Sequence, residues 1–140
     1  MGEGISLYAY LTFNGNCREA MTFYQECFGG DLSLNTVSEN VPALNMPERM
    51  QNCIVQATLF SQNLLLVGTD LVPEHGLLKG NAVSLLLKCI NDDTLHLIYD
   101  YLSTEAVSVR PPFSTDFDRN MAEVTDKLGV PWLLFCDTSD

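Results

Sequence analysis

Few residues of the types that hold metals or attack substrates occur in this chain of 140 residues. It has two histidines, His75 and His96, and five cysteines at wide spacings. No Cys-x-x-Cys pair occurs, so neither a zinc clasp nor a thioredoxin-like pair is predicted. A Cys–His nucleophile would need a cysteine beside a histidine, but His75 lies in a predicted loop and His96 on a predicted helix. The cysteines are typical of a reduced, cytoplasmic protein.

The remaining candidates suit ligand binding better than bond cleavage. Gln56 lies in the middle of a predicted strand, where its amide either hydrogen-bonds a ligand or belongs to a solvated strand face. Several aromatic side chains either line a pocket or fill the core. Arg110 either anchors an anionic ligand or forms a surface salt bridge. The sequence leaves the catalytic residues unknown and the question of enzyme activity open, and we predict a ligand-binding set made of Tyr8, Tyr10, Gln56, Phe113 and Trp132.

The net charge of the chain limits the classes of partner that it could bind. Seven Lys and Arg against 18 Asp and Glu give a formal net charge of −11 at pH 7. This excess argues against nucleic acid and against anionic membrane surfaces, which both require basic residues. A small cationic ligand would be attracted, although the charge also suits a merely solubilising surface. No apolar run approaches the roughly 20 residues that span a bilayer.

The first half of the chain predicts one helix among four strands. Residues 7–13 alternate as in a strand and end at an Asn-Gly turn. Asn16 is then expected to cap a helix in a capping box with Glu19, and Gly29-Gly30 to end it. Three more strands are expected at residues 31–37, 53–60 and 64–67.

The second half repeats this order after a connector at residues 69–80. A strand at 82–90 precedes a helix that Asn91 or Asp92 would cap. A short strand at 107–110 is expected to stop at Pro111-Pro112, which leaves Phe113 in a loop. Two strands follow, at residues 122–125 and 132–136. We therefore predict a single α+β domain over 1–140 with two βαβββ half-repeats, about 7–69 and 80–138, whose curved sheets share a ligand cleft.

Two motifs resemble one known family. Residues 14–24 read NGNCREAMTFY, residues 28–30 read FGG, and residues 126–132 read DKLGVPW. They resemble the opening and the closing signature of the PhnB-like branch of the vicinal oxygen chelate superfamily, and the resemblance covers nearly the whole chain. It implies the glyoxalase/bleomycin resistance/dioxygenase fold and a homodimer. The branch is often labelled as 3-demethylubiquinone 3-methyltransferase-like, but the chain lacks the glycine-rich loop of a Rossmann-type cofactor site.

The resemblance also marks where a metal would bind. Enzymes of the superfamily hold a divalent metal with His and Glu side chains from strands of both halves. The matching positions here carry no such side chain and fall near Ala9, at Leu65 to Val67, at Ser84 or Leu85, and at Leu133. We therefore predict no cofactor and no metal, and a small-molecule-binding protein comparable to the superfamily's drug-sequestering members. The alternatives are a lyase, isomerase or dioxygenase with a non-standard metal site, and an interaction module without a ligand.

Overall fold

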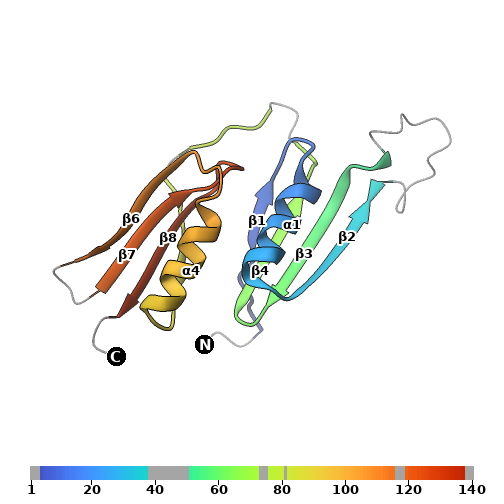
Figure 1. The fold of residues 1–140 in the computed structure, drawn as a ribbon. Helices are drawn as coiled ribbons and strands as arrows, with labels where there is room; N and C mark the ends of the chain where they lie inside the picture. The colour runs from blue at the N-terminus through green and yellow to red at the C-terminus, as the bar shows by residue number, and fades with distance from the viewer. Residues whose placement is uncertain (1–3, 38–50, 73–75, 81, 116–118, 138–140) are drawn as a thin grey trace. The chain divides into compact units, whose positions relative to one another are not determined.

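The computed structural model describes residues 4–37, 51–72, 76–80, 82–115 and 119–137. The chain divides into two compact units, Met1–Leu78 and Lys79–Asp140. Each unit contains a four-stranded sheet with a helix that packs against it, as the ribbon in Figure 1 shows. The α+β class predicted from the sequence is therefore confirmed. In the described part of the chain, no helix is long and apolar enough to cross a bilayer.

The first unit has the predicted βαβββ order. Its elements are β1 (Ala9–Thr12), α1 (Cys17–Phe28), β2 (Asp31–Thr36), β3 (Ile54–Ser61) and β4 (Leu64–Thr69). The strand order is β1-β4-β3-β2, with β1 parallel to β4 and the other neighbours antiparallel. Helix α1 packs on one face of this sheet, and its side chains at helical spacing are buried there.

The second unit repeats that order. Its elements are β5 (Leu85–Lys88), α4 (Asp92–Leu102), β6 (Ser108–Ser114), β7 (Arg119–Thr125) and β8 (Pro131–Asp137). The strand order is β5-β8-β7-β6, again with a parallel first pair. Asn91 caps α4 as predicted, because its side chain accepts a 2.9 Å hydrogen bond from the Thr94 N–H.

The start of α1 is fixed differently from the prediction. Asn16 is the N-cap residue, but its side chain makes no capping hydrogen bond. The carboxylate of Asp70, which follows β4, accepts the N–H groups of Gly15 at 3.0 Å and Cys17 at 2.9 Å instead. Its second oxygen accepts the N–H of Ile54 at 2.9 Å. Asp70 therefore ties the helix start to β3, and the predicted side-chain cap from Asn16 is wrong.

Strand β6 continues through Pro111 and Pro112, where we predicted its end. It is an edge strand, and its pairing with β7 shifts register between Arg110 and Phe113. The two prolines fall in this bulge, where a missing N–H removes no hydrogen bond of the ladder. The prediction of a loop at Phe113 is therefore wrong, and its side chain belongs to the sheet.

Each sheet has one face turned away from the helix of its own unit. A Cβ at Gly68 would lie 2.9 Å from the sulfur of Met21 in α1, so Gly68 and the side chains in phase with it point towards that helix. In the second unit, the Asn120 side chain donates to Asp92 of α4 at 2.9 Å and marks the helix side. We call the opposite faces the first-sheet face and the second-sheet face.

Candidate functional site

The first-sheet face carries three of the five predicted binding residues. Tyr10 and Thr58 pair with the same residue of β4, and Gln56 is in phase with Thr58. Tyr8 packs edge-on against Phe60 with ring centroids 6.5 Å apart, and both rings are about half exposed. The amide of Gln56 donates to the Thr58 hydroxyl at 3.4 Å. This face is therefore aromatic, with a small polar group at its middle strand.

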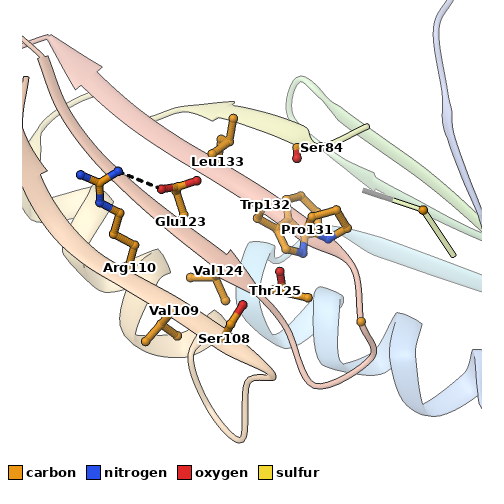
Figure 2. Close-up of a pocket in the computed structure, with 12 residues that line it drawn as sticks. Ser84, Ser108, Val109, Arg110, Glu123, Val124, Thr125, Pro131, Trp132 and Leu133 are labelled. Carbon is orange, nitrogen blue, oxygen red and sulfur yellow. Dashed lines mark hydrogen bonds and ion pairs between the residues drawn. The ribbon is translucent and has the colours of Figure 1, made fainter. Parts of the chain in front are cut away.

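A pocket of about 420 Å³ lies within the second unit. Its charged lining residues are Arg110 and Glu123, on neighbouring strands (Figure 2). Its hydroxyl groups come from the exposed Ser84 and Ser108 and the partly exposed Thr125. Its apolar lining consists of Val109, Val124, Pro131, Trp132 and Leu133. A concave site with apolar walls and a few polar groups is typical of small-molecule binding.

Arg110 and Glu123 form the charged pair of the pocket. They lie directly opposite each other in the β6–β7 ladder, and Nη1 of Arg110 is 3.3 Å from Oε2 of Glu123. The guanidinium carbon of Arg110 also lies 3.7 Å from the ring centroid of Phe113. An exposed ion pair of this kind adds about 1 kcal/mol or less to stability. Together with the contact to the Phe113 ring, it gives the guanidinium two partners at the pocket.

A second group of charged side chains surrounds Arg119 of β7, which lies four residues from Glu123. Asp137 is 3.5 Å from Nε of Arg119 and 3.7 Å from Nζ of Lys88. The Arg119 guanidinium lies 4.7 Å from the centre of the Phe135 ring. Four residues of a strand span about 13 Å, so the second-sheet face has charged residues at two separate places with apolar side chains between them.

Trp132 lies on the helix side of the second sheet and is 2% exposed. Its indole N–H donates to Oδ2 of Asp126 at 2.8 Å. The other oxygen of Asp126 accepts the N–H groups of Leu128 at 2.9 Å and Val130 at 3.0 Å. Trp132 is therefore a core residue that also borders the pocket. Of the predicted set, Phe113 lies on the second-sheet face beneath Arg110, and a direct ligand contact of Trp132 stays a prediction.

The positions that match the metal ligands of the superfamily's enzymes carry no His, Cys, Asp or Glu side chain. Ala9 pairs with Leu66 in the first sheet, and Ser84 and Leu133 line the pocket. No three His, Cys, Asp or Glu side chains of the described residues are grouped so that they could hold an ion together. His75 lies outside the described residues.

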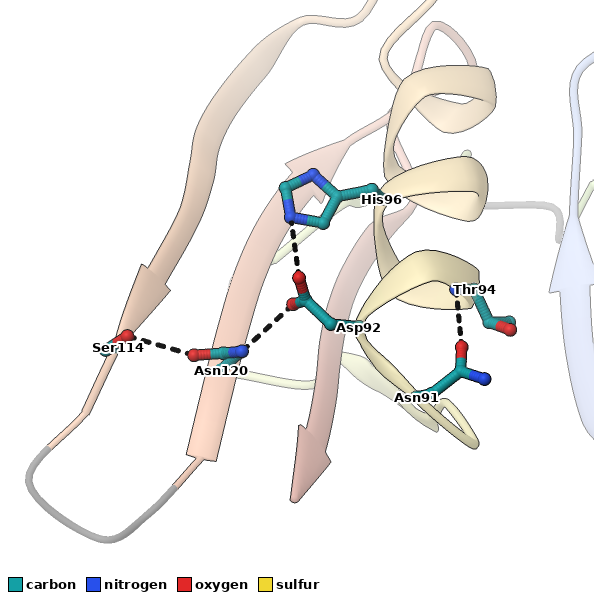
Figure 3. Close-up of polar contacts among 6 residues, drawn as sticks. All are labelled: Asn91, Asp92, Thr94, His96, Ser114 and Asn120. Carbon is teal, nitrogen blue, oxygen red and sulfur yellow. Dashed lines mark hydrogen bonds and ion pairs between the residues drawn. The ribbon is translucent and has the colours of Figure 1, made fainter. Parts of the chain in front are cut away.

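His96 takes part in a chain of polar contacts rather than in the pocket. Its Nε2 lies 3.3 Å from Asp92, one turn earlier in α4. The other Asp92 oxygen accepts the Asn120 amide, whose own oxygen accepts the Ser114 hydroxyl at 3.0 Å (Figure 3). This chain joins α4 to β7 and β6, and its members are largely exposed. It therefore positions the helix on the sheet.

None of the five cysteines is in a disulfide. Burial raises the pKa of Cys17 to about 12, with a further contribution from the Asp70 carboxylate. Burial likewise raises the pKa of Cys89 to about 11, with Cys136 nearby. The thiolate is the reactive form of cysteine, so these buried thiols are poor nucleophiles at neutral pH.

Sequence reasoning considered Arg110 but missed Glu123 and the hydroxyl groups around it. Strict alternation along 119–125 places Glu123 on one face with Met121 and Thr125, and that pattern was available. The pairing of Glu123 with Arg110 could not be predicted from the sequence, because it depends on the register between β6 and β7.

Residues 6–135 match the protein family described as 3-demethylubiquinone-9 3-methyltransferase. The chain is 26% identical to Protein YjdN of Escherichia coli over 135 residues, 89% of this chain and 90% of that protein. The crystal structure of protein PA1353 from Pseudomonas aeruginosa has a TM-score of 0.81 at 26% identity, covering 96% of this chain and 98% of that one. A Bacillus cereus structure described as a putative 3-demethylubiquinone-9 3-methyltransferase, PhnB protein, has a TM-score of 0.74 at 23% identity, covering 94% and 99%.

Proposed function

The chain belongs to the 3-demethylubiquinone-9 3-methyltransferase family, in the PhnB-like branch of the vicinal oxygen chelate superfamily, and we propose that it binds a small molecule without a bound metal. The observation that carries this proposal is the pocket of about 420 Å³ in the second unit. Its side chains can orient a ligand through hydroxyl groups and one Arg–Glu pair, while its apolar side chains can contact the nonpolar part of a ligand. The residues that line it include one carboxylate, which is already paired with Arg110.

The name of the family does not carry over as a methyltransferase activity. A Rossmann-type cofactor site needs a parallel sheet in which a strand leads through a glycine-rich loop into a helix. The described strands instead form two mixed sheets of βαβββ order, and α1 is followed by a strand that pairs antiparallel with β3. We therefore propose binding as the function, with the chemistry of any reaction left to the ligand that is found.

The test is a thermal-shift screen of small molecules against protein treated with a chelator. We expect ligands that raise the melting temperature of the wild type but not of Ser108→Phe, which fills the pocket from β6. Thr104→Phe is the control, because it also replaces a hydroxyl-bearing side chain by Phe, at an exposed turn of the same unit that does not line the pocket. Ligands that stabilise the wild type and Ser108→Phe equally would refute the pocket as the binding site.

The same samples separate binding from metal-dependent catalysis. The alternative is an enzyme of the lyase, isomerase or dioxygenase type with a non-standard metal site. Elemental analysis of gently purified protein, followed by addition of Ni²⁺, Zn²⁺, Mn²⁺ and Fe²⁺, measures this directly. We expect no stoichiometric metal and no stabilisation by added ions; one tightly held ion per chain would overturn the metal-independent proposal.

Three further proposals rest on the family, the cysteines and the charge of the chain. We propose a homodimer, which sedimentation velocity would detect, and a cytoplasmic location, which the lack of disulfides among the five cysteines supports. The net charge of −11 favours a cation, and the exposed rings of Tyr8, Tyr10 and Phe60 could hold one by cation–π contact. Loss of cation binding in Tyr10→Leu would test that role of the first-sheet face.

A further inference from the structure

We infer that the pocket of the second unit binds an oxyanion on an apolar, ring-sized body, with Arg110 as the residue that selects the anion. This inference rests on the proposed function and specifies the class of its ligand. The basic side chains at the pocket, the two contacts of Arg110 and the apolar lining support it independently.

Two basic side chains lie at this pocket, and the two carboxylates near them are already engaged. Arg110 stands on one wall, and the Lys79 ammonium lies 2.8 Å from the place of a Cβ on Gly129, another lining residue. Lys79 is held there because it donates to the Leu128 carbonyl at 2.8 Å. Glu123 is paired with Arg110, while Asp126 is fully buried and accepts three N–H groups. Two basic side chains at one pocket are informative in a chain that has only seven Lys and Arg and a net charge of −11.

Arg110 is oriented to bind a planar anion. Its guanidinium stacks on Phe113 and contacts Glu123 through one nitrogen, Nη1. A guanidinium has five N–H donors in a rigid fork, so it can pair with Glu123 and still present donors to a second oxyanion. The hydroxyl groups of Ser108 and Thr125 lie across from each other in the same ladder and add donors at the pocket.

The rest of the lining suits an apolar body attached to the anion. Pro131 and Leu133 lie on β8 in the pocket wall, and both are partly exposed. Phe135 continues the same face of β8 beyond Leu133. Contact with such side chains removes apolar ligand surface from water and contributes roughly 25 cal/mol per Å².

Arg119 provides a matched control for Arg110. Both arginines lie on the second-sheet face, both stack on a phenylalanine ring, and both pair with a carboxylate. They differ in position, since Arg110 lines the pocket, whereas Arg119 does not line it and lies about 13 Å along β7 from Glu123, the partner of Arg110. Arg110→Gln and Arg119→Gln therefore make the same chemical change inside and outside the proposed site.

The experiment titrates the full-length, chelator-treated protein with three probes that share one ring and chain: 3-phenylpropionate, 3-phenylpropylammonium and 3-phenylpropanol. Trp132 is the single tryptophan and borders the pocket, so its fluorescence reports occupancy, and calorimetry confirms the affinity. We expect 3-phenylpropionate to bind about tenfold or more tightly than the other two. Arg110→Gln should weaken it about tenfold or more, and Arg119→Gln by less than about twofold.

Arg110→Lys separates charge from geometry. It keeps the positive charge but loses the planar fork, so we expect an affinity between those of the wild type and Arg110→Gln. Circular dichroism and melting temperatures establish that each variant is folded.

The inference fails if the ammonium probe binds most tightly, or if the two Arg→Gln variants lose affinity equally. In both cases the pocket still binds a ligand and the proposed function stands. Absence of saturable binding by all three probes also overturns the inference. The Ser108→Phe screen then decides separately whether the proposed function fails with it.

Discussion

The Asp126 carboxylate allows a quantitative test of how the second unit is held together. It accepts the N–H groups of Leu128 and Val130 and the indole N–H of Trp132 at 2.8–3.0 Å, and it is fully buried. Asp126→Ala leaves these three donors without their acceptor. A hydrogen bond to a charged group contributes about 1.5–3 kcal/mol, but neighbouring losses are partly recovered by water.

We therefore expect Asp126→Ala to lower the free energy of unfolding by about 3–5 kcal/mol, because three buried N–H donors lose a charged acceptor and water replaces only part of it. Asp126→Asn should cost less, about 1–3 kcal/mol. Its carbonyl oxygen can still accept the Leu128 and Val130 N–H groups, while its amide then places N–H donors against the Trp132 indole N–H.

Urea unfolding followed by far-UV circular dichroism measures both values. Asp100→Asn is the control, because it removes an exposed carboxylate from α4 of the same unit and should change stability by less than about 0.5 kcal/mol. A double-mutant cycle of Asp126→Asn with Trp132→Phe isolates the indole contact. A loss below about 1 kcal/mol in Asp126→Ala, or no coupling in the cycle, would refute this account of the turn.

Three further predictions concern the first unit. Asp70→Ala should lower the free energy of unfolding by about 2–4 kcal/mol in urea, because three backbone N–H groups lose their acceptor. Gly30→Ala should destabilise by more than about 1 kcal/mol in the same assay, since a Cβ there would collide with the Phe60 carbonyl; Gly76→Ala, with a similar positive φ and open space, should cost less. The pKa of Cys17 is raised to about 12 by burial, so its contribution to stability is constant below the ordinary thiol pKa and is lost as the pH rises towards 12. Stability measured between neutral and alkaline pH should therefore fall less steeply in Cys17→Ala, and an unchanged slope would contradict this.

Local patterns were sufficient to predict the elements, but not all of their contacts. Alternation and helical spacing gave both βαβββ units in the right order, and Asn91 caps α4 through a residue only three positions away. Asn16 has the same residue type at the same kind of position, yet Asp70 accepts the N–H groups there instead. Asp70 lies 53 residues from Cys17, so the packing of β4 beside α1 decides which carboxylate or amide is closest.

The motifs that identify the family have structural roles in this chain. Gly30 follows α1 at a positive φ where the backbone passes close to β3. Asp126 and Trp132, from the closing signature, fix the turn between β7 and β8. Motifs of this kind predict the fold well, because they maintain the turns that the fold requires. They say little about the ligand, since Arg110 and Glu123 lie outside them.

The charge of the ligand shows why the candidate site was harder to predict than the fold. A net charge of −11 favours a cation, but a binding site responds to the charges within a few ångströms and less to those beyond a Debye length of about 8 Å. Lys88, Arg110 and Arg119 are three of only seven basic residues, and the strand registers place all of them on the second-sheet face. Which charges face the pocket depends on those registers, and a bulge at two prolines sets one of them. The net charge of the sequence therefore predicts the average charge of the surface. The class of the ligand depends instead on where a few arginines lie.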